Sequence, residues 1–436
     1  MEKSVLQFPF KVLSKYLFFR RSQRWTLEQL HEYQDLRLRK LVRHAASRVS
    51  YYREVFRNAG LQATEFHGRK DMEQLPLLEK ETVRTRTHEL TADNAEKYGI
   101  NWDSTSGSTG TPLHFISDNG LQSAKIGALL RSYNWAGYRI GARTLSMQSY
   151  YFPNCDQHYH PIYNVLRFDS NQLRKNSLLN LITSINKYRP SLFMGFPFDL
   201  VMLAETVRET DQRIHHPRAI ITYGETLSPR KRKILEQTFG CRVCNFFSLH
   251  EGAAMISECE QGSLHLIDDF AYHEIIDKEG KTMRQGGTGT LVGTSYFNFA
   301  MPFIRYHIGD RVTLAEPGQT CPCGRPLPVI REILGKQCDF IETPDGRFLG
   351  AVMSHAIDNA RGVVCSQCVQ RSLTEIEIRL VIDRSFSEFS QTALERGLRK
   401  RLGNAVKLDF RIVDQLEKTA GGKTPFIISQ IGHKYI

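Results

Sequence analysis

Hydrophobic residues recur at helical spacing through the first part of the chain. Apolar side chains stand three or four positions apart from Leu27 to Val49, and the pattern ends at Asn58-Ala59-Gly60. We therefore expect a helical entry region over residues 1–60. No stretch reaches the roughly 18 uncharged apolar residues that a membrane-spanning helix needs, so none is predicted.

From Ile126 to Val312, short β-branched or aromatic runs alternate with longer helical patterns. The expected strands cover residues 144–147, 192–196, 219–223, 243–247 and 289–296, and the expected helices cover residues 173–188, 199–209 and 229–239. Alternating strands and helices are typical of α/β layers that bind ligands at the strand ends.

Beyond Glu342 the pattern changes to that of a small α+β unit. It predicts a strand over 375–382, an amphipathic helix over 390–402 and a strand over 407–413. We place the boundary near residues 335–339, with an N-terminal domain over 1–338 and a small C-terminal domain over 339–436. The fold class is then α/β, a large multi-layer domain with helices flanking its sheets, plus a small mobile α+β domain.

The formal charge of +12 and pI near 9.2 allow attraction to nucleic acid, anionic lipid or anionic small molecules. The aromatic residues form no stacking platform, so no specific nucleic acid is predicted. The basic, aromatic segment from Lys11 to Arg24 would either contact a membrane surface weakly or pack as a helix on the body. Nine cysteines without an export signal indicate a reducing, cytoplasmic location.

Residues 104–112 consist almost entirely of Ser, Thr and Gly, the composition of a flexible linker or of a phosphate-binding loop. Gly107 and Gly110 let backbone N–H groups approach a ligand, and the hydroxyl groups add donors. The loop lacks the Lys of a Walker A motif, and the GKT at 422–424 has Glu417 in place of the first Gly and is followed by Pro425. We therefore exclude a P-loop NTPase and favour a phosphate loop that works with a distant Lys.

This combination resembles the adenylate-forming superfamily, which contains acyl-CoA synthetases and the adenylation domains of peptide synthetases. Six segments follow in the family's order: TSGSTGTPL at 105–113, YGETLSP at 223–229, NFFSLHE at 245–251, IRYHIGD at 304–310, ILGKQCD at 333–339 and EKTAGGK at 417–423. The early LRKLVRHAASRVSYYREVFRNAGL and the short length are similar to the phenylacetate-CoA ligase branch and its capsule-biosynthesis-like relatives. The resemblance covers nearly the whole chain.

The resemblance implies a role for each motif residue. The ATP phosphates would lie against Thr105, Ser106, Gly107, Ser108, Thr109, Gly110 and Thr111, and the adenine and ribose against Gly224, Glu225, Asn245, Phe246, Asp310 and Lys336. Glu251 would bind Mg²⁺, a hard cation that prefers carboxylate oxygen. Lys423 would stabilise charge as the acyl-adenylate forms, and Asp339 would be the hinge of the C-terminal domain.

The chain departs from the family pattern at several positions. Phe247 replaces the usual Tyr, Ser248 the usual Gly, His250 the usual Thr or Ser, and Lys336 the common Arg. The segment FIETPDGRFLG at 340–350 does not match the one that helps form the family's pantetheine tunnel. Adenylation is therefore better supported than transfer to coenzyme A.

Two short Cys and His pairs suggest a metal site. Cys259 with His265, and Cys321 with Cys323, would form a closed Cys₃His zinc site if the fold brings them together. The alternative is four separate core or turn residues. A rival set, Cys241-x-x-Cys244 with Cys365-x-x-Cys368, is disfavoured because strand positions i and i+3 point to opposite faces.

We thus predict an ATP- and Mg²⁺-dependent ligase that activates an aryl or acyl carboxylic acid as acyl-AMP and transfers it to a thiol, with coenzyme A as the expected acceptor. The enzymatic alternatives are transfer to a carrier protein, an amine or a hydroxyl, or transfer of AMP itself. A non-catalytic nucleotide-binding protein is the alternative of a different class. The sequence does not identify the acid.

Overall fold

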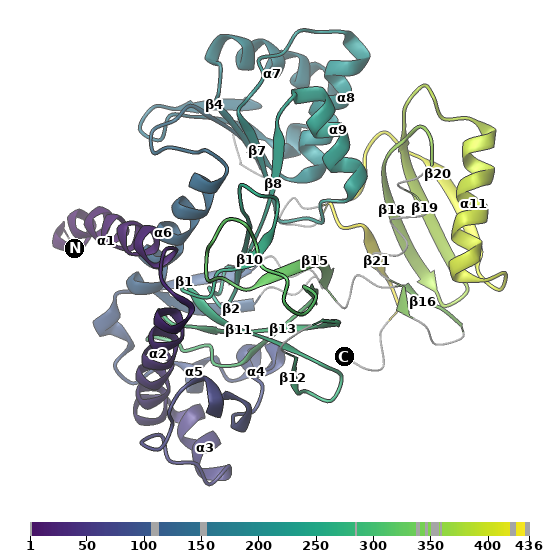
Figure 1. The fold of residues 1–436 in the computed structure, drawn as a ribbon. Coiled ribbons are helices and arrows are strands. Elements are labelled where there is room, and N and C mark those ends of the chain that lie inside the picture. Colours follow the sequence, from purple (N-terminus) through teal and green to yellow (C-terminus); the bar gives the residue numbers. More distant parts are fainter. Residues whose placement is uncertain are drawn as a thin grey trace. The chain divides into compact units, whose positions relative to one another are not determined.

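The computed structural model describes residues 2–105, 113–148, 155–283, 286–336, 341–344, 348–349, 357, 360–418 and 424–431. The chain divides into two compact units, Met1–Ile140 with Phe246–Ile333 and Gly141–Asn245 with Leu334–Ile436. Sheets and flanking helices make up both units (Figure 1), so the expected α/β class is confirmed. The expected boundary between residues 338 and 339 lies within the second unit and stays a prediction.

Unit 1 begins with helices, in agreement with the expected entry region. Its helical elements are α1 (Glu2–Ser22), α2 (Leu27–Arg48), α3 (Ser50–Asn58), η1 (Arg69–Gln74), α4 (Lys80–Thr85), α5 (Thr87–Leu90), η2 (Ala95–Tyr98) and α6 (Asn119–Trp135). Thr26 and Gln29 form a reciprocal capping box that begins α2. Within the described ranges, no helix is both long enough and apolar enough to cross a bilayer.

The strands of unit 1 form a hairpin and a larger, mainly antiparallel sheet. The hairpin pairs β1 (Ile100–Thr105) with β2 (Leu113–Asp118). The sheet has the order β12-β11-β13-β14-β15-β10-β9-β8, from β8 (Arg242–Ser248), β9 (Met255–Glu258), β10 (Leu264–Leu266), β11 (Ala271–Ile276), β12 (Thr282–Met283), β13 (Thr288–Ser295), β14 (Tyr306–Leu314) and β15 (Val329–Lys336). Strands β8 and β15 each carry the chain across the division between the units.

Helix α1 packs closely on α6. Gly127 of α6 allows this approach, because a Cβ there would lie 2.8 Å from the Tyr16 backbone nitrogen. The Tyr16 hydroxyl donates to Asn134 at 2.7 Å, and buried Arg131 pairs with buried Asp269. The first helix is therefore an integral part of unit 1.

Unit 2 contains a parallel α/β layer. Strands β8, β7 (Ala219–Tyr223), β6 (Leu192–Gly195), β3 (Thr144–Gln148), β5 (Val165–Asp169) and β4 (Gln157–His160) follow one another in the sheet. The pairs β7/β6, β6/β3 and β3/β5 are parallel, and β4 is antiparallel to β5. The helical elements are η3 (Ser170–Gln172), α7 (Lys175–Tyr188), α8 (Pro197–Thr210) and α9 (Pro229–Phe239).

The remainder of unit 2 is the small α+β part. Strands β20 (Lys407–Ile412), β19 (Glu375–Ile382), β18 (Val363–Ser372) and β21 (Ile427–Ser429) form one sheet, beside the short pair β16 (Ile341–Glu342) and β17 (Phe348–Leu349). Helix α11 (Glu388–Leu402) lies along this sheet (Figure 1) and packs Leu394 and Leu398 against Ile376 and Ile378. The part thus has a core of its own.

Candidate nucleotide site and metal centre

The Ser/Thr/Gly loop joins the two strands of the β1–β2 hairpin. Thr105 pairs with Leu113 and Ser104 with His114 at the hairpin end. The phosphate-binding candidates Ser106 to Thr111 lie outside the described residues, as does the side chain of Thr105. Because both ends of the loop are held in register, the segment connects paired strands rather than separate domains. This favours the loop interpretation over a flexible linker.

Two predicted ligand residues of unit 1 are buried carboxylates. Glu251 and Asp310 are only 5% and 4% exposed. The Tyr306 hydroxyl donates to Glu251 Oε1 at 3.3 Å. Burial and the charge of Glu251 raise the pKa of Tyr306, and Asp310 contributes in the same direction. The phenol therefore stays a proton donor beside two acidic groups.

The charge of Glu251 also affects the pKa of Lys125. Burial lowers the pKa of Lys125, and the charges of Asp103 and Glu251 oppose that shift. Its ammonium donates to the His250 carbonyl at 3.3 Å. Carboxylates beside ammonium and hydroxyl donors can accommodate a cation together with polyphosphate oxygens. Sequence reasoning did not single out Lys125 or Tyr306.

The two predicted adenine neighbours on β8 fall on either side of the division between the units. In unit 1, buried Phe246 packs edge-to-face on Tyr133 with ring centroids 5.4 Å apart. In unit 2, Asn245 is half-buried. Their contact with a nucleotide stays a prediction.

Strand β7 delivers the predicted residues Gly224 and Glu225 at its carboxyl end. Gly224 has φ +79°, a conformation that favours glycine. The Glu225 carboxylate accepts the backbone N–H of Phe198 at 3.2 Å and that of Thr424. Both carboxylate oxygens therefore hold backbone groups of the protein itself.

Three predicted functional residues are not described structurally. Asp339 and Lys423 lie outside the described residues, and Lys336 ends β15 with its side chain undescribed. The residues that flank Lys423 are described. Lys418 forms an ion pair with Asp199 at 3.2 Å, and Thr424 contacts Glu225.

The four Cys and His residues of the predicted metal site gather in unit 1. Their potential ligand atoms all lie within 4.8 Å of one another. Cys259 Sγ is 3.6 Å from Cys321 Sγ, and Cys323 Sγ is 3.5 Å from His265 Nε2. Cys259 follows β9, His265 lies on the adjacent β10, and the other two cysteines form a turn before β15. Three sulfurs and one imidazole suit tetrahedral zinc.

Neighbouring groups orient these ligands. His265 Nδ1 is 3.0 Å from the Leu327 carbonyl, which directs Nε2 toward the sulfurs. Burial lowers the pKa of His265, so the ring is neutral and can coordinate. The backbone N–H of Gln261 donates to Cys259 Sγ at 3.4 Å. Burial raises the pKa of Cys259 to about 12, and this hydrogen bond opposes the shift. The residues present therefore fit the predicted zinc ion.

The rival cysteine set does not form a comparable group. Among the described residues, the cluster around His265 is the one group of three or more candidate ligands. Burial raises the pKa of Cys241, Cys365 and Cys368 to about 12, but it does the same for Cys259, so the geometry rather than the pKa separates the two sets. Cys244, Cys365 and Cys368 are buried, and Cys241 is partly buried just before β8.

Comparison with known proteins supports the resemblance. Residues 341–430 match the family described as the CapK C-terminal domain. Protein CapK of Staphylococcus aureus is 24% identical over 420 residues, which cover 92% of this chain and 90% of CapK. Phenylacetate-coenzyme A ligase of Thermus thermophilus is 26% identical over 326 residues, 72% of each chain.

These matches support the resemblance to the adenylate-forming ligases and, within them, to the phenylacetate-CoA ligases and CapK. A crystal structure of 2-hydroxyisobutyryl-CoA ligase in complex with an acyl-AMP has the same fold, with a TM-score of 0.75 and 18% identity. The match covers 94% of this chain and 92% of that one.

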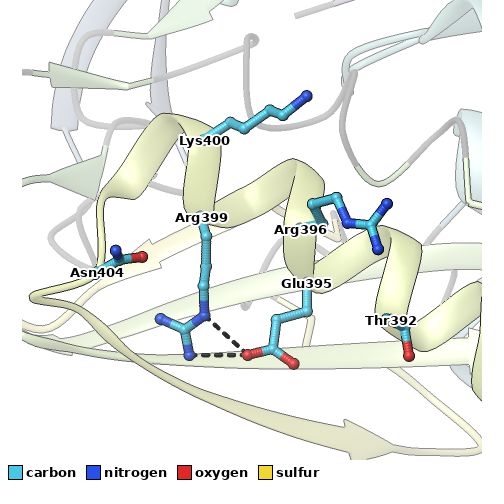
Figure 2. A pocket seen from close by; sticks show the side chains of 6 residues that line it. All are labelled: Thr392, Glu395, Arg396, Arg399, Lys400 and Asn404. Carbon is cyan, nitrogen blue, oxygen red and sulfur yellow. Dashed lines mark hydrogen bonds and ion pairs between the residues drawn. The ribbon is translucent and has the colours of Figure 1, made fainter.

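A shallow pocket of this ligase lies on α11 (Figure 2). It is lined by Thr392, Glu395, Arg396, Arg399, Lys400 and Asn404. Arg399 pairs with Glu395 at 2.8 Å, whereas Arg396 and Lys400 extend from the helix. None of the predicted site residues lines this pocket.

Two apolar runs of the sequence, at 191–203 and at 150–152, could line an acyl pocket or could equally form ordinary core. The apolar run at 191–203 forms β6 and the first half of α8, and Phe193, Leu200 and Leu203 are fully buried in the core of unit 2. The second candidate, Tyr150 to Phe152, lies outside the described residues. The acid therefore stays unidentified.

Proposed function

We propose that this ligase joins a carboxylic acid to AMP at the expense of ATP and then transfers the acyl group to coenzyme A. In the first step a carboxylate oxygen attacks the α-phosphate and pyrophosphate leaves. In the second step the coenzyme A thiol attacks the acyl carbon and AMP leaves. The buried pair Glu251 and Asp310 beside Tyr306 carries this proposal within unit 1.

Each carboxylate has a defined task in this reaction. Glu251 would hold Mg²⁺, which neutralises the phosphate charge when bound. Asp310 would accept hydrogen bonds from the ribose hydroxyls, and Lys423 would stabilise the charge that develops at the α-phosphate. The loop at 105–111 would position the phosphates through backbone N–H and hydroxyl donors.

Coenzyme A is the acceptor that the relatives favour, since they are phenylacetate-coenzyme A ligases and a 2-hydroxyisobutyryl-CoA ligase. A carrier protein is the second candidate, because Arg396 and Lys400 on α11 offer positive charge to an acidic partner. The protein can be incubated with the acid, ATP and each acceptor in turn, and the mass of the product then identifies the acceptor. This measurement also distinguishes transfer to coenzyme A or a carrier protein from transfer to an amine or hydroxyl and from transfer of AMP.

Lys423→Ala tests the adenylation step. A panel that starts with phenylacetate, 2-hydroxyisobutyrate and anthranilate identifies an acid that supports pyrophosphate exchange. The substitution should lower that exchange by at least about tenfold, equivalent to about 1.4 kcal/mol of transition-state stabilisation. A smaller loss of pyrophosphate exchange would show that Lys423 does not stabilise the transition state of adenylate formation. ATP binding without exchange for any acid would favour the non-catalytic alternative.

We also propose that Cys259, His265, Cys321 and Cys323 bind a structural zinc ion. Purified protein should contain about one equivalent of zinc, and Cys321→Ser should lower both zinc content and melting temperature. Less than about half an equivalent in protein purified without chelators would contradict the site. Cys365→Ser, at a core cysteine outside the cluster, is the matched control for zinc content.

The first helix provides a candidate contact with an anionic membrane. Tyr16 and Phe19 are buried, whereas Phe10, Leu13 and Leu17 are 74%, 48% and 54% exposed on the same helix. Exposed Lys11, Arg20 and Arg21 accompany this apolar stripe. Sedimentation with lipid vesicles tests weak surface binding by a cytoplasmic protein. The protein should sediment with anionic vesicles but not with neutral ones, and the double variant Phe10→Ser/Leu17→Ser should lose this binding.

A further inference from the structure

Lys418 connects the segment that precedes Lys423 to helix α8 and to Ser170, within unit 2. Its ammonium lies 3.2 Å from Asp199 Oδ1 and donates to the Ser170 carbonyl at 2.7 Å. The Asp199 side chain is 1% exposed and that of Lys418 is 20% exposed. Adjacent Leu416 is buried in the same core as Leu200 of α8. The contact is therefore a buried one and differs from a loose surface pair.

A second contact holds the chain just beyond Lys423. The backbone N–H of Thr424 donates to Glu225, whose other carboxylate oxygen accepts the Phe198 N–H at the start of α8. Thr424 is itself buried. The residues on both sides of Lys423 are thus attached to the layer formed by residues 141–245.

A different group of bonds joins the same two flanks to each other. Gln367 on β18 is fully buried, and its side-chain amide donates to the carbonyls of Glu417 at 2.9 Å and Pro425 at 3.1 Å. The Glu417 N–H returns a hydrogen bond to Gln367 at 3.2 Å. These bonds lie entirely within residues 339–436.

The resemblance implies that the C-terminal domain turns about Asp339 between the two half-reactions, and the two groups of bonds would respond differently to such a turn. The Gln367 bonds move with the domain and persist. The bonds of Lys418 and Thr424 to residues 170–225 would break in that turn. Only the second group can therefore distinguish one conformation from another.

We propose that Lys418 and Asp199 are a positioning pair that places Lys423 for adenylate formation and separates before thioester formation. The inference rests on the proposed function. It adds two residues that act through Lys423 rather than on the substrate. Glu225 assists them by holding Thr424 and is thereby a positioning residue as well.

The electrostatics of Asp199 suit a contact that must break. Among the described residues, no group makes a hydrogen bond of good geometry with Asp199 Oδ2, although the nearby Ser170 hydroxyl, like Lys418, acts to lower the pKa of this carboxyl. Burial raises the pKa of Asp199 to about 7, and the charge of Lys418 opposes this shift only in part. An incompletely satisfied pair is weaker than a saturated one and can exchange with solvent.

Measuring the two half-reactions separately tests the pair. Lys418→Met and Asp199→Asn are assayed for pyrophosphate exchange with the best acid of the panel, and for thioester formation from purified acyl-AMP and coenzyme A. We expect exchange to fall about tenfold or more through kcat while thioester formation stays within about twofold. Lys418→Arg, which keeps the charge, should retain more exchange than Lys418→Met.

Two control variants separate positioning of Lys423 from a general loss of activity. Gln367→Ala should slow both half-reactions because its bonds serve both conformations. Lys407→Met, at an exposed pair with Glu375 on the same small domain, should change neither. Equal losses in both half-reactions of Lys418→Met, or exchange within about twofold of wild type, would overturn the positioning pair. Absence of exchange in the wild-type protein would instead overturn the proposed function.

Discussion

Two buried ion pairs in this ligase differ in how fully their carboxylates are hydrogen bonded. In unit 1, Arg131 contacts both Asp269 oxygens at 3.0 and 3.1 Å, and the Ser22 hydroxyl donates to the same carboxylate. In unit 2, Lys418 contacts one Asp199 oxygen at 3.2 Å, and among the described residues the other oxygen accepts no hydrogen bond.

The difference follows from the chemistry of the two cations. A guanidinium presents a planar fork that fits a carboxylate, whereas an ammonium is a point charge on a flexible stem. The Arg131 pair joins α6 to residues at the end of α1 and before β11, all of which belong to one unit. Both Asp269 oxygens are hydrogen bonded, although Arg131 Nε has no partner among the described residues, and we call this the saturated pair because of its carboxylate. We infer that the saturated pair is permanent architecture and that the pair with a partly satisfied carboxylate is a reversible contact.

The largest expected effect comes from breaking the saturated pair. Arg131→Met should lower the free energy of unfolding by about 3–5 kcal/mol, because Asp269 would remain buried without its partner. Denaturant unfolding measures the loss. Arg131→Met/Asp269→Asn should recover part of the stability, since the double variant removes the buried charge. A loss below about 1 kcal/mol in the single variant would contradict the assignment of permanent architecture.

Titration of the Asp199 carboxyl in unit 2 should change the free energy of unfolding by an intermediate amount. The raised pKa of Asp199, about 7, means that the folded protein binds this proton more tightly than the unfolded chain. The resulting stability is present at low pH and is lost as the pH rises through 7. Between about pH 5 and pH 8, wild type should lose about 1–3 kcal/mol relative to Asp199→Asn, measured by denaturant unfolding. A constant difference across this range would show that Asp199 does not titrate there.

Much of the secondary structure could be predicted from periodicity. The helix at 229–239 and the strands at 219–223 and 375–382 have the expected bounds, and the other predicted elements differ by one or two residues at their ends. Strand β18 was not predicted because Gln367 and Gln370 are buried within it. Their amides are hydrogen bonded to backbone carbonyls, a form of burial that an apolar pattern does not reveal.

Part of the candidate site could likewise be predicted from the sequence, and part could not. The Cys and His cluster could be predicted because its ligands occur as short pairs, and β9 lies beside β10. The Lys418–Asp199 pair could not, because 219 residues separate its members and Asp199 lies in an apolar run. The one sequence signal was that Lys418 belongs to the EKTAGGK segment. Contacts that depend on tertiary placement leave no local pattern.

The smallest expected effect is at a surface pair of unit 2, and it tests whether burial gives the other two pairs their importance. Lys175 and Glu209 are 3.3 Å apart, with side chains 61% and 37% exposed. Lys175→Met should change the free energy of unfolding by less than about 0.5 kcal/mol, because water screens the charges and both side chains lose conformational freedom in pairing. A loss as large as that of Arg131→Met would mean that helix contacts, rather than desolvation of the charges, set the strength of these pairs. A negligible loss of unfolding free energy would support the view that two properties separate permanent from reversible contacts. These are the burial of the pair and the number of hydrogen bonds that its carboxylate accepts.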